Sequence, residues 1–596
     1  DILLKQTLDG AKSTEQRDSI KNAAQDYTMR KSINFTSVRK ERTNPDAKPK
    51  VYDIENLNAT YAYTEYVHHD FITENDLQKT YKVALAYNYA NQPTYINPFE
   101  RLIKSNLLTL IKDINFNLSP TRINFAINFD RFYSENTLRN IDPSNPLPIP
   151  TNFNKNFNIT RVYGFSWNLT KSFTMDIDAT NLGVVDEPYG RLDGLKIDTL
   201  WRNIRKLGRT TNYNHTLNFN YIVPVNKLPY MDWANLTAHY STNFTWRSAP
   251  EFAIGNPQLN VGNSIQNARK IQFDPDLNLT TLYNKIDFLR APAGTTDDKS
   301  PFTRAMVNLL TSVKGISGNF TRTDATFLPG YLPQSNLFGE DLSYDAPGLG
   351  FLLGSQADIR GKALSRGWLS RDTLQNQLYV QSVEEELRLR ANVSPVSMLD
   401  IQVSFFKRSL RSYQTNFKYL PSSGRFENLS PVTTGSYNIS FFSLATAFAK
   451  EEGINNTSGP YQKFLENRAA ISKRLGRDNP NSTGTGTSGY ADGYGPSSQN
   501  VLIPAFLAAY TGKDASGASL SQFPSVPVPN WQLTYKGLNR LPFLAEVFDS
   551  FDIRNGYQST YLVNSYNTLL QYGESRGKSS VRDVNNDFLP LFQISQ

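Results

Sequence analysis

The strongest constraint on the fold is a long alternation of apolar and polar residues between Ala234 and Arg247. A β-strand points successive side chains to opposite faces, so this segment has one largely apolar face and one polar face. The apolar face ends in two aromatic residues, Phe244 and Trp246, and the segment is longer than the usual ~5–6 residues of a strand in a soluble sheet. These properties together are typical of a transmembrane β-barrel strand, with lipid on one side and water on the other.

The same alternation recurs along much of the chain, which predicts an all-β fold of many strands. Most of the further segments have apolar or aromatic residues at alternate positions, with Asn, Thr, Ser or charged residues between them, and the others are strand candidates of similar composition. The segments are 57–65, 82–89, 114–118, 123–130, 157–169, 173–179, 213–221, 387–393, 399–405, 531–536 and 553–565. We expect a transmembrane antiparallel β-barrel architecture with roughly 16–20 strands in this chain.

The spacing of the connections gives an expected orientation. Short turns fall at 119–122, 170–171, 224–230 and 394–398, with longer connections near 134–155 and 182–211. Outer-membrane barrels have tight periplasmic turns and long extracellular loops. The rhythm therefore predicts that strands 123–133, 172–181 and 231–247 run outward, and that 156–169 and 212–223 run inward.

Composition excludes several other classes of protein. No apolar run approaches the ~18–20 residues of a transmembrane helix, and the most apolar one, Val501–Tyr510, contains Pro504. A mean hydropathy of −0.47 fits a barrel, because only half of each strand faces lipid. The net charge of +8 is spread along the chain without a dense basic block, which argues against a nucleic-acid partner.

No motif in the sequence predicts catalysis or a bound cofactor. There is no cysteine, and the four histidines, His68, His69, His215 and His239, lack the spacing of metal ligands. The glycine-rich stretch 484–490 lacks the Lys and Ser/Thr of a phosphate-binding loop. We therefore predict that the protein is not an enzyme and has no catalytic, cofactor-binding or metal site.

The chain divides into four expected parts. Residues 1–32 are charged and weakly helical over 9–27, and we interpret them as a linker or loop. Residues 33–442 carry barrel strands with long external loops. An insertion at 443–512 contains two expected helices, Tyr461–Leu475 and Val501–Tyr510, separated by a Ser/Gly/Thr/Asn-rich stretch that is expected to be flexible. Residues 513–596 return to strands and loops, and we expect the whole chain to be an internal piece of a longer polypeptide.

Aromatic residues near the expected strand ends are candidates for the girdles that mark the two membrane interfaces. Tyr and Trp are enriched there because an amphipathic ring suits the lipid headgroup region. The candidates are Tyr163, Trp167, Trp233, Tyr240 and Trp246.

Several strings of the sequence, in order along the chain, resemble the SprA (Sov) family, the outer-membrane translocon of the type IX secretion system in Bacteroidetes. The resemblance covers about residue 33 to the end and corresponds to the C-terminal portion of that family. The matching strings are at 34–42, 52–56, 61–65, 186–188, 224–233, 282–285, 327–331, 467–472, 499–510 and 530–531.

The resemblance implies a very large single-chain barrel in the Gram-negative outer membrane, with loops exposed at the cell surface. Such a barrel conducts folded cargo proteins carrying a C-terminal signal domain, and in some relatives it is linked to gliding motility. Its implied partners are outer-membrane lipid, a PorV-type partner barrel and a periplasmic plug protein. The family has no catalytic residues to transfer to this chain.

The alternative is a TonB-dependent outer-membrane nutrient transporter, which shares the alternation but has about 22 strands and an N-terminal plug domain. No plug-like α/β segment is visible in the sequence. The helical insertion at 443–512 is the candidate cap or gate, because helices do not belong in a barrel wall.

Overall fold

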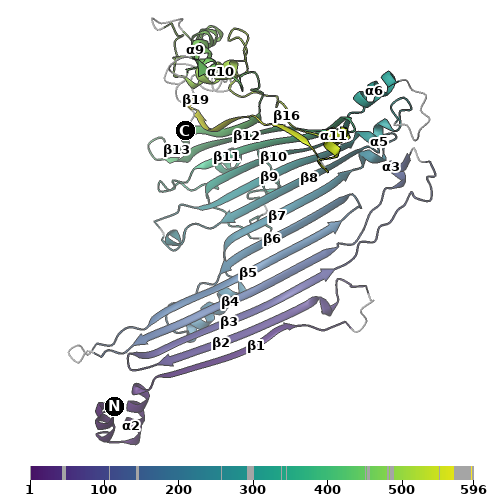
Figure 1. Ribbon diagram of the computed structural model, residues 1–596. Coiled ribbons are helices and arrows are strands. Elements are labelled where there is room, and N and C mark those ends of the chain that lie inside the picture. The colour runs from purple at the N-terminus through teal and green to yellow at the C-terminus, as the bar shows by residue number, and fades with distance from the viewer. Residues whose placement is uncertain are drawn as a thin grey trace.

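One large antiparallel sheet dominates the computed structural model of the chain (Figure 1). The structure describes residues 2–42, 48–105, 108–141, 147–256, 258–290, 301–336, 338–341, 343, 345–449, 451–452, 457–479, 482, 489–549, 551–568 and 592–593. Within these residues the sheet contains 17 strands, and two further short strands form a separate hairpin. The expected all-β, antiparallel architecture is therefore confirmed at the level of the sheet.

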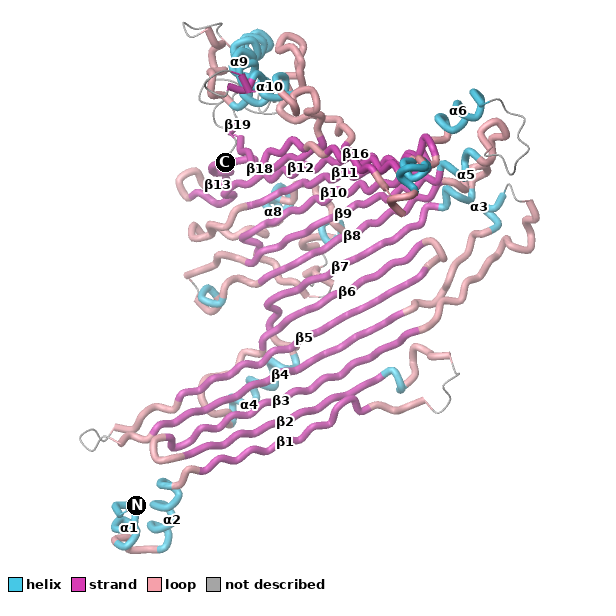
Figure 2. Tube along the Cα trace, in the orientation of Figure 1, coloured by secondary structure: helices cyan, strands magenta, loops and turns pink. Residues whose placement is uncertain are grey.

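The helices lie at the margins of the sheet or on one of its faces (Figure 2). The strands of the sheet are β1 (Tyr27–Val38), β2 (Leu57–His69), β3 (Thr73–Ala90), β4 (Arg122–Leu138), β5 (Asn152–Asn168), β6 (Phe173–Val184), β7 (Arg209–Val223), β8 (Ala234–Arg247), β9 (Asn263–Asn278), β10 (Val313–Tyr331), β11 (Tyr379–Val396), β12 (Leu399–Leu420), β13 (Arg425–Ser440), β16 (Asn530–Tyr535), β17 (Ile553–Tyr557), β18 (Thr560–Thr568) and β19 (Phe592–Gln593). The separate hairpin is β14 (Glu451–Glu452) and β15 (Thr457–Ser458). The helices are α1 (Ile2–Asp9), α2 (Thr14–Ala24), α3 (Thr109–Lys112), α4 (Gly194–Arg205), α5 (Leu279–Tyr283), α6 (Pro301–Leu310), α7 (Leu349–Leu352), α8 (Arg360–Ser365), α9 (Gly459–Asp478), α10 (Gln499–Tyr510) and α11 (Pro542–Ala545).

From β1 to β13, each strand pairs with the next strand in the sequence. The β5–β6 and β11–β12 turns lie at one end of the sheet, which we call the turn end, and the long 332–378 connection lies at the opposite loop end (Figure 1). The expected rhythm of turns and loops is incomplete. The short connections 70–72 and 421–424 lie at the loop end, and the longer connections 91–121 and 279–312 lie at the turn end.

The row after β12 is interrupted. Both β13 and β16 pair with β12, with Lys407 opposite Ile439 and Ser404 opposite Asn530. Val528 N donates to Ser440 O at 3.0 Å, so the chain leaves the row and returns to it at adjacent positions. Residues 441–529, with α9 and α10, therefore emerge from the middle of one strand row. The next row is similarly composed of β17, beside β16, and β18, beside β13.

Several boundaries differ from those expected from the sequence. The first strand begins at Tyr27, and α1 and α2 precede it. The departure from the sheet covers 441–529, which is longer than the expected insertion at 443–512. The alternation at 114–118 does not form a strand, since only an isolated bridge joins Ile96 and Phe116. That alternation is too short, and α3 precedes it directly, so it never joins the ladder of long strands.

Among the described residues, the two borders of the sheet do not pair with each other. β1 has a partner only on the side of β2, and its side chains are almost all exposed. The opposite border is formed by the composite row of β17 and β18, with β19 against the end of β18. The sheet is accordingly open as described.

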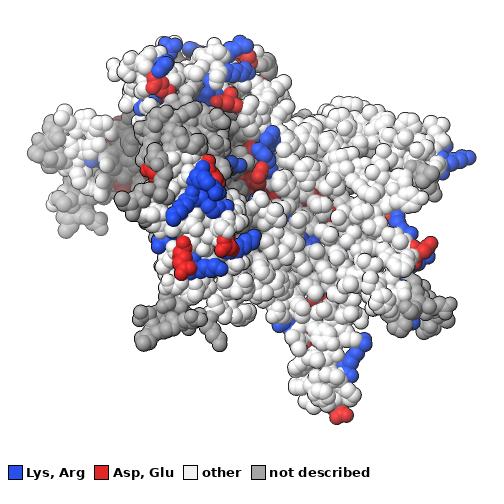
Figure 3. All heavy atoms as spheres, turned by 90° about the horizontal axis from the view of Figure 1, so that it is seen from above, with Lys and Arg blue, Asp and Glu red and all other residues white. Residues whose placement is uncertain are grey.

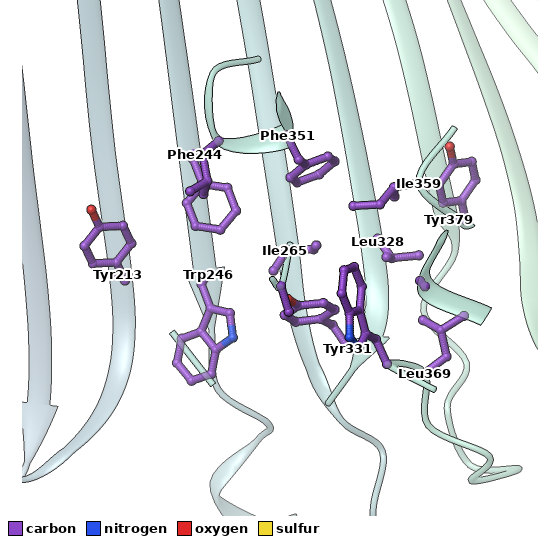
Figure 4. Packing of buried hydrophobic residues seen from close by; sticks show 14 of the residues in the cluster. Tyr213, Phe244, Trp246, Ile265, Leu328, Tyr331, Phe351, Ile359, Leu369 and Tyr379 are labelled. Atoms are coloured by element: carbon purple, nitrogen blue, oxygen red, sulfur yellow. The ribbon is translucent and has the colours of Figure 1, made fainter. Parts of the chain in front are cut away.

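Three of the four buried apolar clusters lie on one face of the sheet, toward the loop end, and the fourth lies between α9 and α10 within the insertion. The largest cluster joins Phe244, Ile265 and Leu328 of neighbouring strands to Phe351 and Trp368 of the 332–378 connection (Figure 4). A second cluster packs α4 against Phe157 and Ile159, and a third packs α10 against Tyr437 and Ile439. Connections that read as loops in the sequence thus form a second layer on this face.

We expect Phe244→Ala to loosen the 332–378 connection. Phe244 is fully buried, and loss of a buried aromatic ring typically costs about 3–5 kcal/mol. The measurement is the rate of limited proteolysis within 332–378 in detergent, which should rise strongly. Phe273→Ala is the matched control, because Phe273 lies on the same face but is 41% exposed. Equal cleavage of the two variants would contradict the proposed packing.

Candidate lipid-facing stripe and polar wall

The register of the sheet divides its side chains into two continuous faces. Cross-strand partners lie on the same face, so the pairs Phe125–Tyr163 and Phe219–Tyr240 place these aromatic residues together on one side. We call the other side the polar wall. Over β4 to β9 the polar wall includes Asn124, Asn128, Asn156, Asn158, Thr160, Thr174, Thr180, Asn214, Thr216, Asn218, Asn220, Asn235, Thr237, Ser241, Asn243, Thr245 and Gln272.

Hydrogen bonds between strands occupy much of the polar wall. Asn243 Nδ2 donates to Asn214 Oδ1 at 2.8 Å, and Ser241 Oγ donates to Asn218 Oδ1 at 2.6 Å. Its charges are largely paired, as in the 2.9 Å contact of Arg122 with Asp178. Seen from above, the molecule carries its charges in a few separate clusters on a mostly uncharged surface (Figure 3). The polar wall is thus hydrophilic but nearly neutral.

The opposite face carries an uncovered apolar stripe next to the turn end. Most strands contribute three or four alternate apolar or aromatic side chains to it, such as Leu57 to Tyr63 on β2 and Ile123 to Phe129 on β4. Several are well exposed, including Leu85 (50%) and Phe125 (39%). β16 and β17 continue the stripe with Trp531 and Tyr557, whose rings stack at 4.4 Å.

The stripe ends at a line of polar and charged side chains on its loop-end side. The first such residue on each strand from β1 to β12 is, in order, Lys31, Glu65, Lys79, Arg131, Arg161, Asn181, His215, Thr242, Arg269, Arg322, Glu385 and Lys407. We call this line the polar border.

The polar border runs obliquely to the strands. Lys79 lies opposite Tyr133, whereas the border on β4 is at Arg131, and Lys407 lies opposite Leu387, two residues beyond Glu385. Followed through all the pairs, the border moves toward the turn end by about one residue per strand, which at ~3.3 Å per residue and ~4.8 Å between strands is a tilt of about 35°. Strands of outer-membrane barrels are tilted by roughly 35–45° relative to the membrane normal. The stripe has the obliquity of a level membrane band crossing tilted strands.

Three of the girdle candidates lie at the edges of the stripe. Trp167 is its last large side chain on β5 at the turn end, where Trp167 Nε1 donates to Asn117 O at 2.9 Å. Tyr163 lies next to the polar border at Arg161, and Tyr240 lies next to it at Thr242. Tyr240 Oη donates to Leu353 O at 2.6 Å, so its hydroxyl points away from the apolar stripe.

The other two candidates have different positions. Trp246 is only 2% exposed, lies beyond the polar border, and donates from Nε1 to Pro333 O at 3.1 Å. It belongs to the cluster covered by the 332–378 connection, so its surface is not available to lipid. Trp233 precedes β8 in the turn-end connection, and its Nε1 donates to Tyr230 O at 2.9 Å.

At and beyond the polar border, polar side chains on the same face as the stripe form hydrogen bonds with the backbone of the 332–378 connection. Thr242 Oγ1 donates to Leu352 O at 3.2 Å, and Asn267 Nδ2 donates to both Phe351 O and Ser355 O at 2.9 and 2.8 Å. A buried backbone carbonyl requires such a partner. Interruptions of the alternation at these positions therefore mark where the covering connection packs on the sheet.

Ion pairs hold the connection that contains α4 in the same way. Arg131 Nε lies 2.6 Å from Glu187 Oε1, and Arg191 Nε lies 2.9 Å from Glu135 Oε2. Glu187 also lies 3.8 Å from Lys155. The two arginine pairs are bidentate or nearly so, a geometry that gives strength and direction to the contact.

Arg360 fixes the 332–378 connection to β11 and β12. Its guanidinium lies over the rings of Tyr379 and Phe417 at 4.4 and 5.2 Å and bonds to Asp358. Burial opposes ionisation of Asp358, but the hydrogen bonds from Arg360 outweigh it and hold the pKa of that carboxyl below its usual value. Glu340 has no such arginine, and burial raises the pKa of its carboxyl.

The polar border was not identified from the sequence. Residues such as Arg161 and Arg269 fall on the apolar rows and read as simple interruptions of the alternation. Only the register shows that these interruptions line up across neighbouring strands. A sequence signal does exist, since most of these residues lie directly before or after a run of alternate apolar positions on the same strand.

The described residues contain no group of three or more His, Asp and Glu side chains placed to hold a metal ion. No described helix is long and apolar enough to cross a membrane. The sequence matches no protein-family model and no curated protein.

We expect protection of the 332–378 connection to fall as the pH rises. Because the pKa of Glu340 is raised, its contribution to stability is fully present below the unfolded value of about 4.3 and is lost as the pH rises through the folded value. Hydrogen exchange of this connection, corrected for intrinsic rates, should show this loss in the parent protein as the pH rises above the unfolded value.

In Glu340→Gln this part of the pH dependence should disappear, because the amide does not titrate. Asp358→Asn is the contrasting variant and should lose protection at neutral pH, because its ionised carboxylate holds Arg360. An unchanged pH profile in Glu340→Gln would contradict the assignment.

We expect Leu85→Arg to disfavour insertion into a bilayer far more than Ala84→Arg. Leu85 lies in the middle of the stripe and Ala84 is its neighbour on the polar wall. An arginine at the lipid-facing midplane of a barrel costs about 2–4 kcal/mol. The measurement is urea-dependent folding into lipid vesicles. Equal effects of the two substitutions would show that the stripe does not face lipid.

Proposed function

We propose that this chain forms part of the wall of a transmembrane β-barrel in a Gram-negative outer membrane, and that the barrel conducts proteins to the cell surface. The observation that carries the membrane assignment is the oblique apolar stripe on the face opposite the polar wall. A soluble sheet would cover such a stripe with a second layer, whereas here the covering connections stop at the polar border.

The chemistry of the polar wall favours a wide conduit. The sheet consists of β1 to β12 and two composite rows, which among the described residues do not close on each other. Barrels of 16–18 strands enclose an aqueous channel, so the proposed wide conduit requires strands in addition to these rows, as the resemblance to the SprA family implies. A nearly neutral wall of amides and hydroxyls hydrates well and gives a folded protein few apolar contacts to adhere to.

The resemblance of the sequence to the SprA family supports the type IX secretion pathway for this conduit, with gliding motility linked to it in some relatives. The proposed partners are a PorV-type barrel at the side of the wall, a periplasmic plug protein, and cargo proteins with a C-terminal signal domain. Membrane lipid contacts the stripe. No side-chain chemistry in this proposal requires a cofactor.

Residues 441–529 are placed better for lateral docking than for closing the lumen. α10 packs through Ile503 and Leu507 against Tyr437, Ile439 and Tyr561, which lie on the face of the stripe and not on the polar wall. The insertion therefore emerges on the outer side of the proposed barrel, just above the stripe. A partner barrel embedded in the same membrane would meet it there.

We expect replacement of 442–527 by a short Gly-Ser linker to leave the wall intact and to remove the partner barrel. The wall should persist because Ser440 and Val528 already share a hydrogen bond at 3.0 Å. The measurements are mass spectrometry of co-purifying chains and single-channel conductance in planar bilayers, with a 16-stranded porin as reference.

The parent should conduct more than the porin, and the variant should match the parent in conductance while losing the partner. A conductance no larger than that of the porin would contradict the wide conduit. A conductance that increases on deletion, with the partner retained, would instead make the insertion a gate.

A further inference from the structure

A groove of about 710 Å³ lies on the polar wall where β16 and β17 meet β11 and β12. The groove lies close to the point where residues 441–529 separate β13 from β16. The side chains that it takes from the polar wall are Arg390, Asn392, Gln402, Ser404, Asn530, Gln532, Arg554 and Gln558.

Gly556 opens the floor of this groove. It lies opposite Gln532, and a Cβ added to it would meet no heavy atom within 4 Å. Gly164, elsewhere on the polar wall, is different. A Cβ added there would lie 2.9 Å from the side-chain amide of Asn124, which already occupies the space beside this glycine. The groove is therefore real empty volume rather than a gap that a neighbouring side chain already occupies.

The groove carries positive charge that the chain does not neutralise. Arg388 and Arg408, on the same wall, each lie 2.6 Å from a glutamate, Glu386 and Glu384 respectively. The side chains of Arg390 and Arg554 make no ion pair or hydrogen bond with other side chains or with the backbone in the part of the chain that the structure describes. No Asp or Glu occurs among the residues that line the groove.

The remaining lining chemistry selects among anions. The amide side chains of the groove offer both donors and acceptors, which complement the N–H and C=O groups of a peptide backbone. Asn530 offers mainly its donor, because its Oδ1 already accepts from Ser559 N at 2.9 Å. A phosphate group has acceptors only and would leave the amide carbonyls without partners. A volume of this size suits a ligand of several residues rather than a small ion.

We propose that this groove binds an extended acidic peptide segment, with its carboxylates on Arg390 and Arg554 and its backbone along the amides. On a wall that is otherwise nearly neutral, it is a point of retention for an acidic segment of a protein inside the lumen. The inference concerns binding alone, so it does not depend on transport and can be tested without it.

The test uses the full chain in detergent and fluorescence anisotropy of a fluorescein-labelled peptide of alternating Ser and Glu. The same peptide with Gln in place of Glu is the ligand control. Arg390→Gln and Arg554→Gln should each weaken binding by about tenfold or more, because a hydrogen bond to a charged group contributes about 1.5–3 kcal/mol. Gly556→Leu should weaken it by filling the floor.

Arg247→Gln is the matched control, since Arg247 is an exposed arginine of the polar wall on β8, outside the groove. It should bind as the parent does. Each variant is first checked for folding on a denaturing gel. Only variants whose unheated and heated samples migrate like those of the parent are compared.

Three results would each overturn the proposal: equal binding of the Gln peptide, equal weakening by Arg247→Gln, or displacement of the Glu peptide by inorganic phosphate at the same concentration as by unlabelled Glu peptide. The last result would identify a small-anion site instead of a peptide groove.

Discussion

The backbone ladder that joins β1 to β18 is the constraint on which the other features depend. Because a strand alternates its side chains, a register slip of one residue would move every apolar side chain of that strand to the polar wall. The pairs are continuous over twelve successive strands, and the register shifts lie at or near strand ends. The oblique stripe, the neutral wall and the groove at Arg390 are all consequences of that register rather than of any one side chain.

Much of this architecture could be predicted from the sequence because the alternation is a local signal. The segment from Ala234 to Arg247 forms β8 with those bounds, and its two faces are as expected. Trp246 was expected at a membrane interface, but its partner is the 332–378 connection, which is rich in Gly and Pro and gives no local sign of where it folds. The split row at Ser440 and Asn530 could not be predicted either, since it depends on two distant strands sharing β12.

One row of side chains therefore meets two environments. On the turn-end side of the polar border, a strand such as β9 presents Ile271 and Phe273 to the surroundings of the protein. On the other side, Asn267 binds the backbone of a covering connection. Apolar side chains suit both lipid and a protein core, but a buried backbone carbonyl needs a donor, and lipid has none to satisfy. Polar residues on the apolar row are thus informative about which environment lies outside.

The same reasoning explains where residues 441–529 can leave the wall. Inside a bilayer every backbone N–H and C=O must be paired, so a strand row cannot be interrupted at the depth of the hydrocarbon. The border residue of β12, Lys407, lies opposite Ile439, and the chain departs one residue later, after Ser440. β13 thus lies wholly on the covered side of the border, and β16 lies wholly within the stripe. If the stripe faces lipid, as proposed, the insertion begins at the first position where water or protein can satisfy its backbone.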